Sequence, residues 1–205
     1  MKTKWNIKCS LPVNFSVQLT PEILNPDNPA LLEKGSSKRR LVLVDSEVFR
    51  LFGSKIKEYF LRNSIEVKIV SIDISEEKKD LQTLMFILSI VENFGLLRRS
   101  EPIIAIGGGV LLDIVGFAAS VFRRGVPYIK VPTTLLSIVD ASVGIKTSIN
   151  HFSRRNRLGS YYPPVAAYLD KNFLLTLPPH EIHQAMGEII KLAVVKNQQL
   201  FMLLE

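Results

Sequence analysis

The sequence predicts an α/β domain built on a mostly parallel sheet. Short apolar runs of strand length recur along the chain, and segments with the apolar spacing of helices separate them. The run Ile103–Ile106 ends in three glycines, Gly107, Gly108 and Gly109, directly before a helix-like segment. Glycines at that place let the backbone approach a ligand closely and aim amide N–H groups at a phosphate, although a tight turn without a ligand is the alternative.

The first part of the chain contains a candidate edge strand, a loop and a buried strand. Ser10–Leu19 alternates apolar and polar residues, which predicts an edge or hairpin strand, and 25–37 has the composition of a loop. Arg40–Val44 predicts a short buried strand that ends at Asp45. Asp45 either accepts hydrogen bonds from a ribose or caps the helix expected at Val48–Leu61, and the two roles are compatible.

The next strand is expected at Val67–Ile72, followed by a helix that runs to about Phe94. Ser75 is suited to cap that helix, with acidic residues in its first turn. By residue type alone, Glu76 and Lys79 are more typical of a solvated helix start than of a binding site.

Two polar features follow the glycines. Asp113 lies near the start of the expected helix, where its charge is favourable, and among apolar neighbours it needs a partner. Tyr128–Val131 predicts the fourth strand, which Pro132 stops. Thr133 and Thr134 then offer two hydroxyl groups, either as hydrogen-bond donors to a cofactor or as a helix cap.

Polar residues are concentrated after that strand. Asp140 and Lys146 are separated by small residues, as in a loop that binds a polar substrate. Arg155 and Arg157 are suited to hold a phosphate, and a solvated basic loop is an equally good interpretation. Ala166–Leu169 predicts one more short strand.

A break at Leu177-Pro178-Pro179 divides the chain into an expected ligand-binding α/β domain, 1–176, and the start of a helical domain, 177–205. His180–Leu204 is strongly helical, with apolar residues such as Ile190 at core spacing. The chain ends within that helix. We therefore expect a fragment, or a split or truncated gene product, of a longer protein.

Charged and histidine residues on this last helix have simple interpretations. Glu188 and Lys191 are three positions apart on one face, where a surface ion pair contributes about 0.2–0.5 kcal/mol. His180 and His183 share that spacing, but their position in a first helical turn beside prolines favours a helix start over a metal site.

Composition narrows the function classes. The chain of 205 residues has a formal net charge of +7 with its basic residues in short clusters, which suits a phosphorylated small molecule better than nucleic acid. The single cysteine excludes an intrachain disulfide and a cysteine metal cluster. We expect a cytoplasmic protein without a membrane contact, because no signal peptide and no run of roughly 18 apolar residues is present.

A set of motifs extends over nearly the whole chain: Gly107-Gly108-Gly109 with Asp113, FRRG at 122–125, VPTTLL at 131–136, VDASVGIKT at 139–147, NRLG at 156–159, LPP at 177–179 and GEIIK at 187–191. In this order and spacing they resemble the sugar phosphate cyclases, whose best-known member is 3-dehydroquinate synthase. The chain looks like the N-terminal half of a family member. The resemblance implies a Rossmann-like NAD-binding domain of the dehydroquinate synthase-like fold, followed by the first helix of a truncated α-helical C-terminal domain.

Within the family, the forms GIKT, NRLG and YYPP look more like the 2-epi-5-epi-valiolone synthases, which cyclise the phosphorylated ketose sedoheptulose 7-phosphate. 3-Dehydroquinate synthase typically has two glycines before the loop lysine, where this chain has Gly144 and Ile145. It also has a Lys-Asn pair where this chain has Arg155-Asn156-Arg157. Thr147 and Pro163-Pro164 argue against the related desmethyl-4-deoxygadusol synthases.

The resemblance implies tightly bound NAD and a divalent metal, zinc or cobalt. In the implied reaction one substrate hydroxyl is transiently oxidised by NAD, phosphate is eliminated, the carbonyl is reduced again and a C7 cyclitol ring closes by intramolecular aldol addition. The positions that match the family's NAD site are Asp45, Glu76, Lys79, Gly108, Gly109, Asp113, Thr133 and Thr134. Those that match its polyol and phosphate site are Asp140, Lys146, Asn156 and Lys191, with Arg155 in place of the usual lysine.

The resemblance also carries expectations about assembly. Arg124 matches an arginine that reaches the site of a neighbouring subunit, which implies a homodimer. Glu188 matches one metal ligand, and the family's other two are histidines of the C-terminal helical domain, for which a complementing chain would be needed. Because a catalytic zinc takes at least three protein ligands, we expect this polypeptide alone to bind NAD weakly and to lack cyclase activity.

Other functions stay open at this point. A 3-dehydroquinate synthase fragment and a nonenzymatic NAD-binding subunit of a split cyclase are the main alternatives. A relative of the iron-dependent dehydrogenases ranks last, because such proteins lack counterparts of VDASVGIKT and GEIIK.

Overall fold

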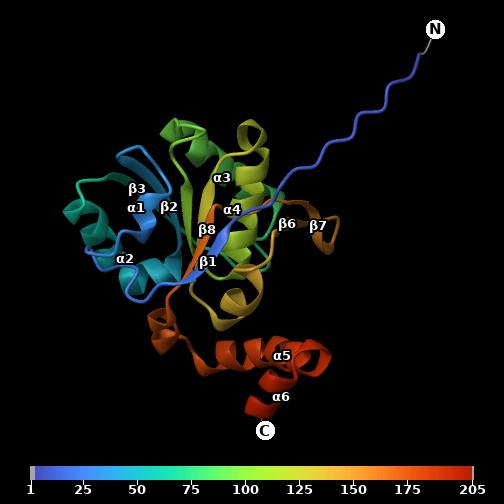
Figure 1. Ribbon diagram of the computed structural model, residues 1–205. Helices are drawn as coiled ribbons and strands as arrows, with labels where there is room; N and C mark the ends of the chain where they lie inside the picture. Colours follow the sequence, from blue (N-terminus) through green and yellow to red (C-terminus); the bar gives the residue numbers. More distant parts are fainter. Residues whose placement is uncertain (1–2, 205) are drawn as a thin grey trace.

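The computed structural model describes residues 3–204 and contains a six-stranded parallel sheet with helices on both faces (Figure 1). The strand order is β1-β8-β5-β4-β2-β3. The central strands are nearly continuous apolar runs because both of their faces are buried, as is usual in parallel sheets. The strands are β1 (Ser16–Leu19), β2 (Arg39–Asp45), β3 (Glu66–Ile72), β4 (Ile103–Gly107), β5 (Tyr128–Pro132) and β8 (Ala166–Leu169).

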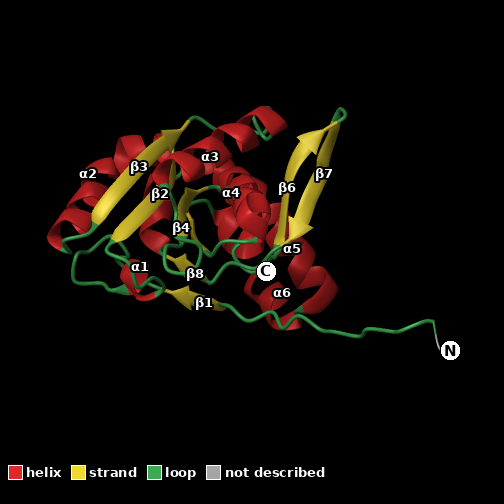
Figure 2. Cartoon of the chain, turned by 90° about the horizontal axis from the view of Figure 1, so that it is seen from above, coloured by secondary structure: helices red, strands yellow, loops and turns green. Residues whose placement is uncertain are grey.

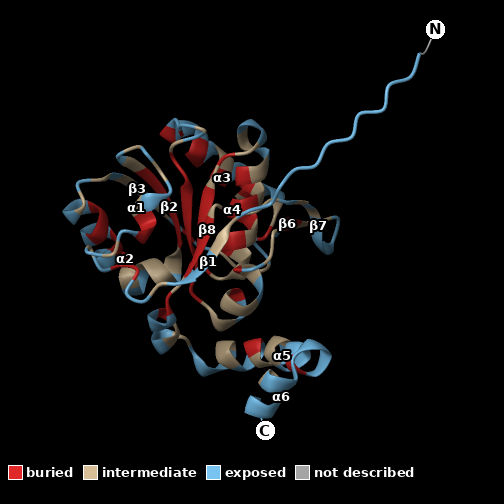
Figure 3. Cartoon of the chain, viewed as in Figure 1, coloured by how far each residue is buried: buried red, intermediate tan, exposed pale blue. Residues whose placement is uncertain are grey.

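Helices form the two outer layers (Figure 2). The short α1 (Ala30–Glu33) and the long α2 (Ser46–Arg62) contribute to the core on one face of the sheet. α3 (Leu81–Phe94) and α4 (Gly109–Val121) build the core on the other face. The central strands β2, β4 and β5 between these layers are the most deeply buried part of the chain (Figure 3).

Two structures lie outside this three-layer core. β6 (Lys146–His151) and β7 (Arg154–Tyr161) form an antiparallel hairpin beside α4. A 3₁₀ turn at Lys171–Thr176 then leads to α5 (Pro179–Lys196) and α6 (Gln198–Leu204), which are largely exposed (Figure 3). The domain boundary between residues 176 and 177 stays a prediction.

The order of the strands creates a switch point between β2 and β4. β3 is added on one side of β2, whereas β5 is added on the far side of β4. In open α/β sheets, ligands bind in the crevice at the carboxyl ends of the two strands at such a point. Asp45 ends β2 and Gly107 ends β4, so the fold brings two sequence-predicted site elements to one crevice.

The five strands expected from 40 to 169 are confirmed, although β3 is only partly buried, and three other expectations are wrong in detail. Only Ser16–Leu19 of the expected strand 10–19 is formed. It pairs in parallel with β8 at the sheet edge, so the edge alternative is confirmed and the hairpin alternative is wrong. The expected loop 25–37 contains the short helix α1. The last helix is interrupted at Asn197, whose backbone is extended, and Ile190 is exposed instead of buried.

The helix expected from Ser75 begins later, at Leu81. Its cap is Asp80, whose carboxylate accepts the amide of Thr83 at 2.8 Å. The Ser75 hydroxyl instead donates to Glu77 at 2.8 Å. Within residues 3–204, no helix combines the length and the apolar character needed to cross a membrane.

Arg40 ties the loop before β2 to the core. The residue is 1% exposed, and its guanidinium donates to the carbonyl oxygens of Leu32 at 2.8 Å, Gly35 at 3.0 Å and Ser37 at 2.5 Å. Burial lowers the pKa of Arg40 from its ordinary value, and the negative charge of Glu101 opposes this shift. These hydrogen bonds take the place of hydrogen bonds to water for three carbonyl groups in the segment before β2.

Arg40→Met is expected to lower the free energy of unfolding by about 2–4 kcal/mol, because three carbonyl groups lose a charged donor inside the protein. Urea unfolding followed by circular dichroism measures the change. Arg62→Met removes an exposed arginine at the end of α2 and, as the control, should cost less than about 1 kcal/mol. Equal unfolding midpoints for the two variants would contradict the role of Arg40.

Candidate cofactor and substrate site

Asp45 lies against the glycine turn at the mouth of the crevice. A Cβ atom placed on Gly107 would stand 3.1 Å from the Cβ of Asp45. The Asp45 carboxylate accepts the amide of Glu47 at 2.9 Å and so caps α2, which confirms one of its two expected roles. Burial raises the pKa of Asp45, and the amide hydrogen bonds from Glu47 and Val48 oppose the shift. Its contact with a ribose stays a prediction.

The glycine turn leaves the start of α4 open to a ligand. Gly108 is the N-cap residue, and no side chain in the described part of the chain caps this helix, so the first-turn amides lack an intrahelical partner. A Cβ atom on Gly109 would meet no heavy atom within 4 Å, which shows free space beside those amides. This arrangement fits an anionic group such as the pyrophosphate of a dinucleotide.

Thr133 and Thr134 border the same turn from the end of β5. The Thr133 amide donates to the carbonyl of Gly107 at 3.1 Å, and a Cβ atom on Gly108 would lie 3.3 Å from the Thr134 side chain. The Thr134 hydroxyl accepts the backbone amide of Ser137 at 3.2 Å, in agreement with the capping interpretation of Thr134. For both threonines, contact with a cofactor stays a prediction.

An ion pair between a buried lysine and a partly buried aspartate connects the crevice with the hairpin. The ammonium of Lys79, a residue only 5% exposed, lies 2.6 Å from Asp113 Oδ2 and 2.7 Å from Asn156 Oδ1. The Ser148 hydroxyl donates to the same Asn156 oxygen at 2.9 Å. Burial raises the pKa of Asp113, and the Lys79 ammonium opposes the shift. The expectation of a solvated Lys79 is wrong, whereas the partner expected for Asp113 is present.

A second set of hydrogen bonds holds the hairpin to the segment before α3. Asn150 Nδ2 donates to Glu76 Oε1 at 2.9 Å, and the Asn150 amide donates to the Lys79 carbonyl at 2.6 Å. The Asn156 amide donates to Asn150 Oδ1 at 2.8 Å, and Asn156 has a φ of 52°, which asparagine tolerates better than most residues. Arg155 is exposed, with Nε 3.7 Å from Glu76. The role of Asn150 gives no local sequence signal, because its partner Glu76 lies 74 positions away.

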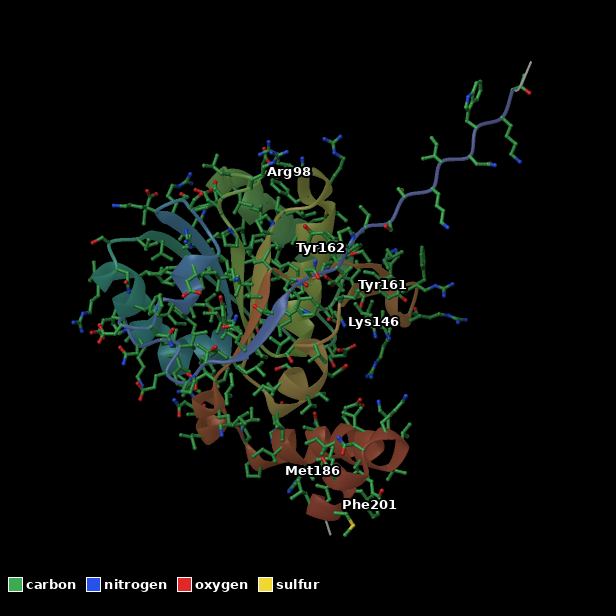
Figure 4. The ribbon with its side chains drawn as sticks, viewed as in Figure 1. Arg98, Lys146, Tyr161, Tyr162, Met186 and Phe201 are labelled. Atoms are coloured by element: carbon green, nitrogen blue, oxygen red, sulfur yellow. The ribbon has the colours of Figure 1, made fainter. Side chains whose placement is uncertain are left out.

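Asp140 belongs to a defined turn and Lys146 to a strand, so the two do not lie in an open loop. Ser137–Ala141 forms one π-helical turn, and Lys146 begins β6. Both side chains are exposed, and Lys146 stands opposite Tyr161 in the hairpin (Figure 4). Lys130 of β5 donates to carbonyl groups of the stretch between them. Lys130 is likewise not predictable as a site residue, because one lysine inside an apolar run gives no functional signal.

The basic residues after the hairpin turn lie on a strand and not in a loop. Arg155 and Arg157 both belong to β7 and are exposed on either side of Asn156. Their guanidinium groups are therefore accessible to an anionic ligand.

Three expected residues lie apart from this cluster. Arg124 lies in the turn after α4, at the opposite end of that helix from Gly109, so the structure does not bring it to the crevice of its own chain. Glu188 and Lys191 form an ion pair on α5, 2.5 Å apart, as the simple interpretation of their spacing predicts. α5 contacts the π-helical turn that carries Asp140.

The described residues do not complete a metal centre. No group of three or more His, Cys, Asp or Glu side chains converges within residues 3–204. A catalytic zinc takes three protein ligands and keeps a fourth position open. Glu188 alone is one candidate ligand, and its carboxylate is engaged by Lys191. The residues present therefore fit a dinucleotide, but they do not by themselves fit a metal.

A family model and a curated relative match this chain. The family model described as 3-dehydroquinate synthase N-terminal matches residues 69–184. The 2-epi-5-epi-valiolone synthase of Actinomyces sp. is 40% identical over 210 residues, which cover 100% of this chain and 55% of that protein. The chain thus spans about half the length of the curated relative.

Two solved structures share the fold. A 2-epi-5-epi-valiolone synthase from Streptomyces hygroscopicus subsp. jinggangensis 5008, with NAD⁺ and Zn²⁺ bound, has a TM-score of 0.92 at 38% identity, covering 98% of this chain and 55% of that chain. A 2-deoxy-scyllo-inosose synthase complexed with carbaglucose-6-phosphate, NAD⁺ and Co²⁺ has a TM-score of 0.77 at 29% identity, covering 86% and 47%. The Rossmann-like α/β fold implied by the resemblance is confirmed. Because the family model matches more than half of the chain, this chain belongs to the 3-dehydroquinate synthase family of sugar phosphate cyclases and corresponds to the N-terminal half of those relatives.

Proposed function

We propose that this chain binds NAD in the crevice between β2 and β4 and forms one side of a cyclase site for sedoheptulose 7-phosphate. The product is a C7 cyclitol of the 2-epi-5-epi-valiolone type. The observation that carries the proposal is the Lys79 ammonium, which joins Asp113 beside the glycine turn to Asn156 on the hairpin. The valiolone synthases among the relatives support this reaction class.

The cofactor is held by groups that line the crevice. The first-turn amides beside Gly108 and Gly109 bind the pyrophosphate, and Asp45 accepts hydrogen bonds from a ribose. When bound, NAD supplies a reversible hydride acceptor, so the substrate is oxidised and later reduced without net redox change. The other residues assigned to cofactor binding are Glu76, Lys79, Asp113, Thr133 and Thr134.

The substrate side consists of the turn and the hairpin. Lys146 and Arg155 offer exposed positive charge to the phosphate, which leaves as an anion. The exposed carboxylate of Asp140 accepts hydrogen bonds from polyol hydroxyls. Asn156 is oriented by Lys79 and so presents its amide group in a fixed direction. Lys191 adds a further cation from α5.

The metal ligands and the contact with a second subunit come from outside the crevice and the hairpin. Glu188 contributes one ligand to a divalent metal, and two histidines on a complementing helical segment or chain contribute the others. Arg124, exposed at the far end of α4, reaches the site of a neighbouring subunit in a homodimer. The chain by itself therefore binds NAD but does not complete the reaction.

Two other functions remain candidates. 3-Dehydroquinate synthase acts on a phosphorylated keto-acid, and the exposed Arg155 and Arg157 on β7 offer cations for the extra carboxylate. A nonenzymatic NAD-binding subunit of a split cyclase would bind NAD without supporting turnover in any combination.

Gly109→Ala is expected to weaken NAD⁺ binding at least about tenfold, or about 1.4 kcal/mol, because the added methyl group fills the space beside the α4 amides. The substitution should not disturb the fold, since that methyl group meets no protein atom within 4 Å. Isothermal titration calorimetry measures the affinity. Gly187→Ala, on α5 and equally free of neighbours, is the matched control. Unchanged NAD⁺ affinity in a folded Gly109→Ala chain would falsify this placement of the cofactor.

The chain mixed with NAD⁺, Zn²⁺ and sedoheptulose 7-phosphate is expected to release no phosphate, because Glu188 alone cannot hold a catalytic metal. Addition of the C-terminal half of the Actinomyces relative should produce phosphate release, and Lys146→Met should abolish it. A colorimetric phosphate assay measures both outcomes.

Turnover by the chain alone would contradict the proposed division of the site. Faster phosphate release from the phosphorylated keto-acid than from sedoheptulose 7-phosphate would favour the 3-dehydroquinate synthase alternative. NAD⁺ binding without turnover in the mixture would favour the nonenzymatic subunit.

A further inference from the structure

Lys130 places a buried charge at the centre of the sheet. It lies on β5, which has a strand on either side, and it is 1% exposed. Lysine is almost never fully buried unless its ammonium has partners. Here Nζ donates to the carbonyl oxygen of Ala141 at 2.7 Å and to that of Gly144 at 2.8 Å.

Both of these carbonyl groups lie in the stretch between Asp140 and Lys146. The stretch also closes on itself, because the Ser142 amide donates to the Ser137 carbonyl at 2.9 Å and the Gly144 amide donates to the Asp140 carbonyl at 3.0 Å. Through these two hydrogen bonds Lys130 joins the closed turn to the sheet. Its ammonium therefore fixes the backbone between the two residues that the proposed function assigns to the substrate.

The surroundings of Lys130 show which property of the side chain matters. Burial lowers the pKa of Lys130 to about 8, against the opposing effect of Asp113 on α4 and Asp140 on the turn. The ring of Tyr128, on the same strand, lies 5.8 Å from the ammonium. A neutral lysine amine still has two N–H donors, enough for both carbonyl groups. The hydrogen bonds, more than the charge, hold the turn.

We propose that Lys130 is a positioning residue for the substrate side of the site. By holding the turn 137–145 on β5, it sets where Asp140 lies relative to Lys146, and it contacts neither NAD nor substrate. The inference rests on the proposed function for the roles of Asp140 and Lys146. A lysine that only stabilised the fold would affect the cofactor side and the substrate side alike.

Lys130→Met removes the donors at nearly constant side-chain length, whereas Lys130→Arg keeps them. In the Met variant, NMR-detected hydrogen exchange of the Ser142 and Gly144 amides is expected to accelerate at least about tenfold, and the Arg variant should restore most of the protection. NAD⁺ affinity should change by less than about twofold, while affinity for sedoheptulose 7-phosphate with NAD⁺ present should fall at least about tenfold. Lys68→Met, which removes an exposed lysine from β3, is the matched control and should change none of these quantities.

The outcomes separate this inference from the proposed function. A wild-type chain that binds neither NAD⁺ nor sedoheptulose 7-phosphate overturns the proposed function, and the exchange rates still decide whether Lys130 holds the turn. Unchanged exchange in Lys130→Met, or equal losses of both affinities, overturns the positioning role. Should Lys130→Met not fold, Lys130→Leu, which also lacks N–H donors, takes its place. Rapid hydrogen exchange of the Ser142 and Gly144 amides in the wild-type chain would by itself contradict the positioning role, because it would show that the turn is not held in place.

The pH dependence of stability checks the burial of Lys130 independently. Between about pH 8 and about pH 10, the unfolded chain keeps a proton on Lys130 that the folded chain has lost, so the free energy of unfolding should rise with pH. Above that range Tyr128 acts in the opposite direction. Burial raises its pKa, so the tyrosine of the unfolded chain loses its proton at a lower pH, and the free energy of unfolding falls as the pH increases. Urea unfolding at closely spaced pH values measures the profile. Lys130→Met should lack the rise, and parallel wild-type and variant profiles would contradict it.

Discussion

The ion pair between Lys79 and Asp113 is the constraint on which the rest of the site depends. A charged group that loses contact with water costs free energy unless it is partnered, and here the buried Lys79 ammonium meets the partly buried Asp113 carboxylate at 2.6 Å. They come from the segment before α3 and from α4, and Asn156 of the hairpin completes the cluster. The pair therefore fixes the position of the glycine turn at the start of α4 relative to the basic strand β7. The proposed binding of a cofactor and a phosphorylated substrate in one crevice depends on that relation.

How far the sequence predicts this structure depends on whether the signal is local. Ile103–Ile106 and Tyr128–Val131 are continuous apolar runs, as strands buried on both faces must be, so these strands are predictable. The start of α3 is not, because Ser75 and Asp80 are both competent caps and the burial of Lys79 favours the later one. The hairpin of β6 and β7 is also not predictable from local sequence. β7 is mostly polar and exposed, and distant side chains hold it in place.

The two buried lysines of the site illustrate this limit. Lys79 is charge-compensated by a carboxylate, and its neighbourhood of acidic and basic residues resembles an ordinary helix start. The Lys130 ammonium donates hydrogen bonds to two backbone carbonyl groups. Because every residue has such a carbonyl group, the sequence does not show which ones are its partners. The need for a partner is predictable for Asp113 from its apolar neighbours, whereas the identity of that partner requires the fold.

The edge strand β1 has a consequence for the order in which the chain can fold. Ser16 pairs with Ala166, roughly 150 residues later, so β1 has no partner until almost the whole sheet has been synthesised. During translation, β3, β2, β4 and β5 can pair with one another before β8 is synthesised, whereas residues 16–19 remain unpaired. The pairing of β1 with β8 is thus a late event, which joins the strand that is first in the sequence to the strand that is last. Ribosome-bound chains shorter than about 170 residues would carry this segment as a free, strand-competent tail.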